Sequence, residues 1–239
     1  MSVALCALAT AESLACDVRV DDPKVVFPLE KMDRPALCRL AGVVNGYTTH
    51  RILPAFQTPI QKSVYDFILD HPILAAALAR HLEVASYRIV RAGPNSFQGD
   101  DSQGSEGLIE LLYRDSVRRV YHMRGSHRGN IFPVITGEAI ILLNYRASPS
   151  GDGRESVETR ITTYSRLDNP VLATIVRALQ PLLRNVVNDK VAEGFLSAHK
   201  LGELMAMEPE RVYRVAEGIT EVDKNDIEAL KALLRLPRP

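Results

Sequence analysis

The chain has 239 residues, of which 46% are hydrophobic and 24% charged, and its 29 basic side chains are balanced by 29 acidic ones. These are ordinary values for a globular protein, and a chain of this length can bury a sizeable core without a metal or disulfides. A balanced chain has no overall field to attract nucleic acid. No uncharged apolar run approaches the roughly 20 residues that cross a bilayer. The sequence therefore predicts neither a nucleic-acid-binding nor a membrane-spanning protein.

The first sixteen residues differ from the rest. Residues 2–11 (SVALCALATA) form a short apolar run that ends in Ala9-Thr10-Ala11, the small-x-small pattern that a signal peptidase accepts. The run lacks the basic region that begins a normal secretory signal. Two interpretations stay open. Residues 1–16 are a signal or apolar leader, which predicts a periplasmic or extracellular protein, or they form an apolar helix of a cytoplasmic one.

The three cysteines, Cys6, Cys16 and Cys38, are an odd number without metal-ligand spacing. If the leader is removed after Ala11, Cys16 and Cys38 remain and could pair in an oxidising compartment. The alternative is that Cys38, within the apolar stretch 36–44, is a small buried hydrophobic residue. We favour the second interpretation.

Helix signals dominate the segment before residue 83. Asp33-Arg34-Pro35 predicts the cap and first turn of a short helix, after two extended pieces within residues 17–29. Thr58-Pro59 predicts the start of a clearer helix, with Thr58 as its cap. Asp70-His71-Pro72 repeats this signal, so we expect two consecutive helices with a sharp bend at Pro72.

From Tyr87 the pattern becomes that of strands. Residues 93–107, rich in Gly, Asn, Ser, Asp and Gln, predict a loop. Strands are expected at residues 87–91, 108–114, 117–124, 134–146 and 156–166. The short connections between consecutive strands imply antiparallel pairing, because a parallel crossover needs about a dozen residues or more.

Asp168-Asn169-Pro170 begins an apolar stripe at helical spacing that runs to Met205. It predicts a long helix of roughly 50 Å, kinked at Pro181, that must bury its stripe against the sheet. Two short helices are expected to follow, and we assign them to a C-terminal helical appendage, residues 208–239. Residues 17–207 form the main domain in this interpretation.

The order of elements resembles the helix-grip fold of the START-like superfamily, which includes polyketide cyclases, lipid-transfer domains and the birch-pollen-allergen group. The segments that carry the resemblance are residues 64–70 (VYDFILD), 159–166 (TRITTYSR) and 171–205. It covers roughly residues 59–205. The resemblance implies an α+β fold in which an antiparallel β-sheet is gripped by a long C-terminal helix. It also implies a cavity between them that suits a lipid, sterol or polyketide-like ligand.

Alternation along the expected strands and the helical stripe predicts which side chains would line such a cavity. The predicted ligand-binding residues are Tyr113, Arg119, Tyr121, Met123, Ile141, Ile161, Val176 and Leu183. Ordinary core packing accounts for the same apolar pattern, and this alternative stays open. An inward Arg119 would need a partner, because an unpaired buried charge is costly, and Glu138 or Glu110 could serve. The surrounding arginines and histidines either grip an anionic head group or form a solvated sheet face.

The six histidines show no metal-binding spacing, and the chain has no nucleotide-binding or hydrolase motif, so neither a metal nor a cofactor is expected. The sequence then favours binding or transport of a hydrophobic small molecule. The first alternative is a cyclase- or dehydratase-like enzyme that uses Tyr113, Arg119, Tyr121 and His122. The second is a non-catalytic envelope interaction protein that docks a partner through residues 209–236.

Overall fold

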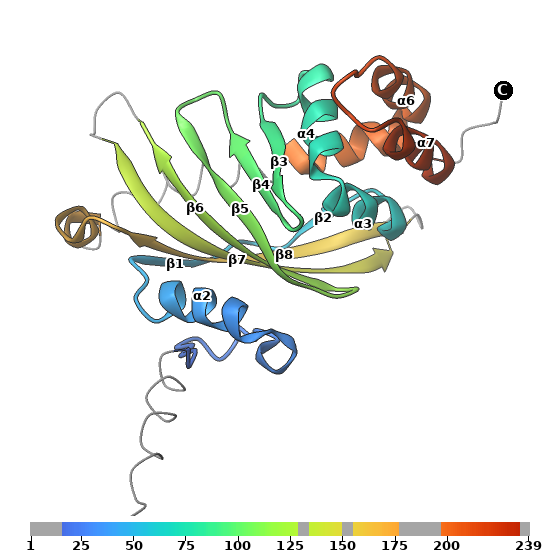
Figure 1. Ribbon diagram of the computed structural model, residues 1–239. Helices are drawn as coiled ribbons and strands as arrows, with labels where there is room; N and C mark the ends of the chain where they lie inside the picture. Colours follow the sequence, from blue (N-terminus) through green and yellow to red (C-terminus); the bar gives the residue numbers. More distant parts are fainter. Residues whose placement is uncertain (1–15, 129–133, 150–154, 177–196, 235–239) are drawn as a thin grey trace, which may run out of the picture.

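A computed structural model of the chain describes residues 16–128, 134–149, 155–176 and 197–234. Within these ranges one antiparallel sheet carries helices on both faces (Figure 1). The strands are β1 (Thr49–Ile52), β2 (Phe56–Thr58), β3 (Arg88–Gly93), β4 (Ser96–Asp100), β5 (Ser105–Arg114), β6 (Arg118–His127), β7 (Ile135–Pro149) and β8 (Glu155–Leu167). The helices are η1 (Leu29–Lys31), α2 (Arg34–Val44), α3 (Lys62–Asp70), α4 (Pro72–His81), α6 (Pro209–Glu217) and α7 (Lys224–Leu233), and residues 170–176 and 197–207 are also helical.

The sheet has the strand order β1-β8-β7-β6-β5-β4-β3, and β2 also pairs with β8. From β3 to β8 each strand pairs with the next one along the chain, and all pairs are antiparallel. This confirms the α+β class and the antiparallel pairing predicted from the short connections. The described sheet therefore ends on one side at β1 and β2, which both pair with β8, and on the other side at β3, which pairs with β4.

Several predicted helix starts are confirmed by their caps. Asp33 accepts a hydrogen bond from the Ala36 amide at 2.8 Å and begins α2. Asn169 accepts from the Val171 amide at 2.9 Å and begins the helix over residues 170–176. The bend between α3 and α4 lies at His71, because Pro72 disfavours helical geometry in the residue before it.

Two expectations about local structure are wrong. Residues 93–107 contain β4 and the start of β5, where a loop was expected. Thr58 does not cap a helix, because its backbone belongs to β2, opposite Val157, and α3 begins only at Lys62. Residues 17–28, where two extended pieces around a turn are expected, are irregular on both sides of a turn at residues 23–24 and pair with no strand, and η1 and α2 follow them.

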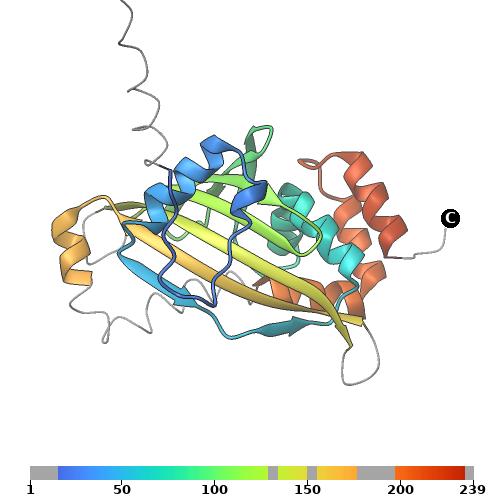
Figure 2. The ribbon, with the colours of Figure 1, turned by 90° about the horizontal axis from the view of Figure 1, so that it is seen from below.

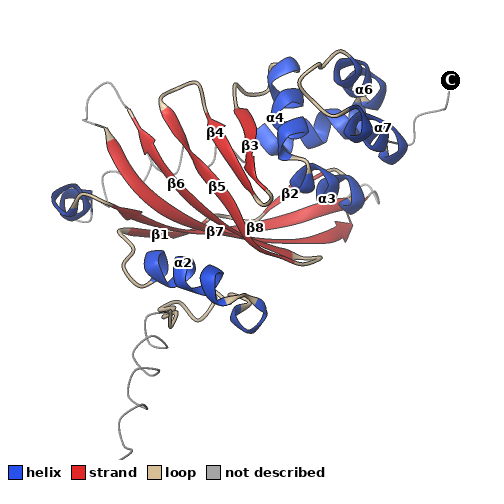
Figure 3. Ribbon diagram, in the orientation of Figure 1, coloured by secondary structure: helices blue, strands red, loops and turns tan. Residues whose placement is uncertain are grey.

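The two faces of the sheet are covered by different parts of the chain, as Figures 2 and 3 show. We call the face under α2 and the N-terminal segment the outer face, and the face under α3, α4 and the C-terminal helices the inner face. The outer core contains Val25, Phe27, Leu40, Val44, Val120, Ile140, Leu142 and Tyr164. The inner core contains Val64, Leu78, Leu143, Ile161, Met205, Val212 and Leu230.

A row of glycines crosses four adjacent strands at one register. Gly99, Gly107, Gly125 and Gly137 are neighbours in turn on β4, β5, β6 and β7. A Cβ atom on Gly107 would lie 2.6 Å from the carbonyl oxygen of Arg124, so the strand backbones approach too closely here for any side chain. Glycine at such positions lets a sheet bend sharply. The row therefore contributes to the curvature of the sheet around its inner face (Figure 1).

The C-terminal helices pack into the inner core. α6 lies against α4, and α7 lies against α3 and α6. The expected long C-terminal helix is helical at both described ends, residues 170–176 and 197–207. Its middle, which contains Leu183 and the kink expected at Pro181, lies outside the described residues, as does the expected N-terminal leader. No helix in the described ranges has the length and apolarity needed to span a membrane.

Cys16 and Cys38 form a disulfide that joins the N-terminal segment to α2. The interpretation of Cys38 as a free buried hydrophobic residue is therefore wrong. The sequence could not decide this, because the pairing depends on how the segment before α2 folds back over the outer face (Figure 2).

Candidate ligand-binding site

The inner face gathers five of the eight predicted ligand-binding residues. Tyr121 on β6 lies opposite Ile141 on β7, and Arg119 lies opposite Leu143, which in turn faces Ile161 on β8. Met123 lies two residues after Tyr121 on β6 and therefore on the same face. Counting Ile161, five of the eight predicted residues share this face of the sheet.

The other three are placed differently. Val176 is half-buried in the helix over residues 170–176, at the opposite end of the sheet from α3 (Figure 1). Leu183 lies outside the described residues. Tyr113 belongs to the outer face, where it lies opposite Val120 and packs against the outer core.

The expectation that Tyr113 points inward is wrong for a local reason. The register between β5 and β6 shifts between Leu111 and Tyr113, which is the mark of a β-bulge. A bulge inserts one extra residue and reverses the alternation beyond it. His122, a polar candidate of the enzyme hypothesis, also lies on the outer face, within 4.0 Å of Glu110 and 3.9 Å of Glu138.

The middle of the inner face is an apolar floor that is only partly covered. Its strands contribute side chains that are all half-buried, namely Phe97, Ile109, Leu111, Tyr121, Met123 and Ile141. Nearer α3 and β8 the same face is fully buried, at Leu143 and Ile161. Ligand sites are lined mainly by apolar side chains, with a few polar groups that fix the orientation of the ligand, so this floor is a candidate binding surface.

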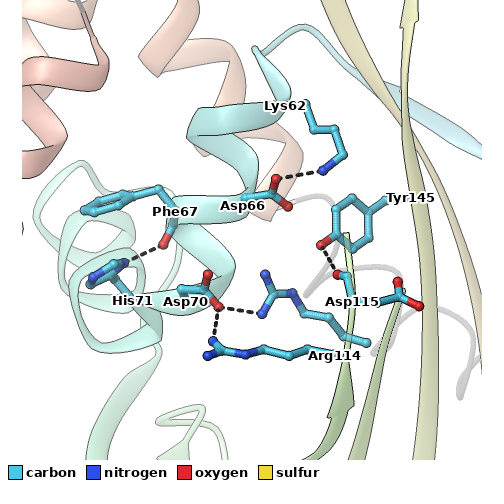
Figure 4. Close-up of polar contacts among 9 residues, drawn as sticks. Lys62, Asp66, Phe67, Asp70, His71, Arg114, Asp115 and Tyr145 are labelled. Carbon is cyan, nitrogen blue, oxygen red and sulfur yellow. Dashed lines mark hydrogen bonds and ion pairs between the residues drawn. The ribbon is translucent and has the colours of Figure 1, made fainter. Parts of the chain in front are cut away.

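Such polar groups lie at the α3 end of the floor. We call them the Asp70–Arg119 cluster; its members are Lys62, Asp66 and Asp70 from α3, Arg114 and Arg119 from β5 and β6, and Tyr145 from β7 (Figure 4). The Arg119 side chain is 3% exposed and donates through Nη1 to Oδ1 of Asp70 at 2.6 Å. Arg114 donates to the same oxygen at 2.9 Å, and Lys62 pairs with Asp66 at 2.7 Å.

The partner of Arg119 is therefore Asp70, and the expectation of Glu138 or Glu110 is wrong. Those two glutamates lie on the outer face, where Glu138 binds Arg166 at 2.7 Å and Glu110 binds Arg39 at 3.2 Å. Asp70 ends α3 and is separated from Arg119 by 49 residues. Only the packing of α3 over the sheet brings them together.

Burial and the ion pairs set the protonation of the cluster. Burial acts to raise the pKa of Asp70, but the hydrogen bonds and charges of Arg119 and Arg114 outweigh it, so the pKa of Asp70 lies below its usual value. Burial raises the pKa of Tyr121 to about 12. It also raises the pKa of Tyr145, with a further contribution from Asp66. At neutral pH the carboxylate of Asp70 is charged and both phenols are protonated.

Most phenols near the cluster already have partners. The Tyr65 hydroxyl shares a hydrogen bond of 3.1 Å with the Thr159 hydroxyl, and that of Tyr145 donates to the Asp115 carbonyl at 3.4 Å. The Tyr145 ring packs 5.4 Å from that of Tyr65, and Lys62 Nζ lies 5.1 Å from its centroid. The Tyr121 hydroxyl has no hydrogen-bond partner in the described part of the chain. No group of three metal-ligating side chains occurs among the described residues.

Comparison with known proteins gives no match to a family model and none to a curated protein. Among solved structures the chain is similar to a conserved protein from Geobacillus kaustophilus, with 14% identity and a TM-score of 0.46 over 63% of this chain and 93% of that one. It is similar to norcoclaurine synthase from Thalictrum flavum, with 15% identity and a TM-score of 0.41 over 67% and 88% of the two chains. It is also similar to Ara h 8.0201, with 14% identity and a TM-score of 0.40 over 66% and 99%.

At these identities the similarities concern the fold alone. The structure itself has the α+β arrangement predicted from the sequence, an antiparallel sheet with a helix pair before β3 and C-terminal helices on its inner face. Any inference about the chemistry of a ligand must therefore rest on the residues of the inner face.

Proposed function

We propose that the protein binds or transports a hydrophobic small molecule, such as a lipid, a sterol or a polyketide-like compound, on the inner face of its sheet. The observation that carries this proposal is the half-buried apolar floor, with Tyr121, Met123 and Ile141 at its centre, beside a buried polar cluster. Burial of each 100 Å² of apolar ligand surface would contribute about 2.5 kcal/mol. Contact with the six apolar side chains of the floor is therefore the expected main source of affinity, against the cost of association.

The first test asks whether purified protein carries a ligand. Native mass spectrometry of the full chain, followed by solvent extraction, should find a co-purifying apolar molecule. After extraction, the neutral fluorophore N-phenyl-1-naphthylamine should bind with enhanced emission. Extracted protein that stays folded and yet fails to bind the fluorophore would contradict the proposal.

A pair of variants then locates the site. Met123→Glu places a charge in the middle of the floor and should weaken binding of the fluorophore by at least about tenfold, because a buried unpaired carboxylate is costly. Leu108→Glu is the matched control on β5, since Leu108 is 39% exposed and faces outward, opposite Arg124. Equal binding by both variants would place the ligand elsewhere.

An enzyme of the cyclase or dehydratase type is the second candidate. Its support is the inward position of Arg119 and Tyr121, where a protonated phenol could donate to a substrate oxygen. Its other two polar candidates, Tyr113 and His122, lie on the outer face. A phenol with a pKa of about 12 is also a poor base at neutral pH. Binding without turnover is therefore the better-supported reading of this face.

An interaction role for residues 209–236 has less support. The apolar faces of α6 and α7, with Val212, Ile227 and Leu230, are buried in the inner core. The described helices thus use their apolar faces within the chain, which leaves mainly polar faces for a partner.

We also propose that the chain is exported and works in the periplasm or outside the cell. The Cys16–Cys38 disulfide supports this, because such bonds persist mainly in oxidising compartments. Fractionation of cells that express the full chain should find it outside the cytoplasm, with a new N-terminus near residue 12. A cytoplasmic, uncleaved chain with free thiols would overturn the proposal.

A further inference from the structure

We infer that the ligand carries a neutral oxygen, as a hydroxyl or a carbonyl group, which accepts a hydrogen bond from the hydroxyl of Tyr121. The inference rests on the proposed function and deepens it by naming the polar group that orients the ligand. The class it predicts is a neutral apolar molecule with one oxygen at the end that faces α3.

The position of Tyr121 between the two parts of the inner face motivates this. On β6 it follows Arg119 of the polar cluster and precedes Met123 of the apolar floor, all on one face. Its ring is half-buried and lies opposite Ile141. A ligand that rests on the floor would therefore bring its α3-facing end to this hydroxyl.

Tyr121 also has a hydrogen bond to offer. The hydroxyls of Tyr65 and Tyr145 are engaged by Thr159 and by the Asp115 carbonyl, whereas that of Tyr121 has no partner within the described residues. With its pKa raised to about 12 by burial, the phenol keeps its proton at neutral pH and acts as a donor. The Tyr121 hydroxyl is not among the fully buried polar atoms without a partner, so in the ligand-free protein water can reach it. A ligand that displaces this water has to supply an acceptor in its place, because a buried donor without a partner is costly.

Charge argues for a neutral acceptor over a carboxylate. The buried cation Arg119 is already paired with Asp70 at 2.6 Å, and Lys62 is paired with Asp66 at 2.7 Å. The remaining cation, Arg114, shares Asp70 and its side chain is 62% exposed. An arriving carboxylate would thus be desolvated without a counter-ion of its own and close to Asp70, which is unfavourable.

The test compares ligands that differ only at the polar end. Decan-1-ol, undecane and decanoate would each displace N-phenyl-1-naphthylamine from extracted protein. Tyr121→Phe should weaken the binding of decan-1-ol by about three- to tenfold, which is the range for one neutral hydrogen bond. It should leave the affinity for undecane unchanged. Circular dichroism and thermal unfolding would confirm that the variant is folded.

Tyr164→Phe is the matched control. Tyr164 is a phenol of the same sheet whose pKa is also raised to about 12 by burial, but it lies on the outer face, stacked on His50. Its removal should leave the affinities for decan-1-ol and undecane unchanged.

The outcomes separate the two proposals. If no probe displaces the fluorophore, or the fluorophore does not bind, the proposed function and this inference both fail. If the probes bind but Tyr121→Phe affects decan-1-ol and undecane equally, only this inference fails. Decanoate that binds wild type more tightly than decan-1-ol would also overturn it, in favour of a charged end.

Discussion

At the scale of single residues, the contact with most consequence is the ion pair between Arg119 and Asp70. Arg119 is 3% exposed, whereas the Asp70 side chain is about one third exposed, at 35%. Removal of one partner from a buried pair costs more than the pair itself contributes, because the other charge is left buried without compensation. The effect should therefore depend on which partner is removed and whether the other remains.

Asp70→Asn should lower the free energy of unfolding by about 2–4 kcal/mol, because it leaves the Arg119 charge buried without its counter-ion. Adding Arg119→Met should recover part of that loss. Arg114→Gln is the control and should change the free energy by less than about 0.5 kcal/mol, since Arg114 is 62% exposed. Urea unfolding measures all three. A loss for Arg114→Gln equal to that for Asp70→Asn would contradict this account.

His122 predicts a dependence of stability on pH. Burial lowers the pKa of His122 from 6.5, and Arg39 and Arg124 lower it further, although Glu138 and Glu110 oppose this. The unfolded chain therefore takes up the proton first. Stability should be fully present above about pH 7 and should fall as the pH drops below 6.5.

In His122→Asn this loss between pH 7 and about 5 should be smaller than in the wild type, as urea unfolding at several pH values would measure. The exposed His81, whose side chain is 43% accessible, gives the control His81→Asn, which should keep the wild-type dependence. Parallel curves for wild type and His122→Asn would show that other groups cause the acid loss.

Part of the site was predictable from the sequence at the level of single residues. Alternation placed Arg119, Tyr121 and Met123 together, since period 2 holds along β6. It misplaced Tyr113, because a bulge leaves no composition signal in a run of ordinary residues. It missed Asp70, because a contact between a helix end and a strand depends on tertiary packing.

At the scale of elements, the strands with apolar alternation were predictable and β4 was not. The segment before Gly107 is rich in Gly, Ser, Asn and Asp, which is typical of a loop. In the structure two of its glycines, Gly99 and Gly107, belong to the row that bends the sheet. A glycine-rich composition is thus compatible with a loop and with a bent strand. Only the alignment of the glycines across four paired strands distinguishes the two, and the sequence does not show that alignment.

Gly107→Ala should therefore destabilise the fold by about 2–4 kcal/mol, because the added methyl group would meet the Arg124 carbonyl and the Gly125 backbone. Gly42→Ala is the matched control, since Gly42 lies in α2 with no atom within 4 Å of the added methyl group. It should stabilise by up to about 1 kcal/mol through helix propensity. Thermal unfolding compares the two variants. Equal changes in the unfolding temperature would contradict the role of the glycine row in bending the sheet.

At the scale of the whole molecule, one sheet separates two apolar cores, and the outer one depends on a short N-terminal segment. Val25 and Phe27 of that segment are buried against the sheet together with Leu40 of α2. The sequence predicted α2 but not the face it covers, because an amphipathic helix specifies only that it must be buried. The same holds for α6 and α7, whose apolar faces join the inner core.

The Cys16–Cys38 disulfide closes this segment onto α2, across a sequence separation of 22 residues. A closed loop of this size should contribute about 3 kcal/mol by restricting the unfolded chain. A reductant should therefore lower the unfolding temperature of the wild type. It should not change that of Cys16→Ser/Cys38→Ser, which should already unfold at the lower temperature.

Fluorophore binding on the inner face should survive in the reduced protein at temperatures where it stays folded, because the disulfide lies on the other side of the sheet. A wild type that is insensitive to reductant, with two alkylatable thiols at these positions, would show that the bond does not form. Loss of binding on reduction, in protein that remains folded, would instead mean that the outer layer controls the shape of the inner face.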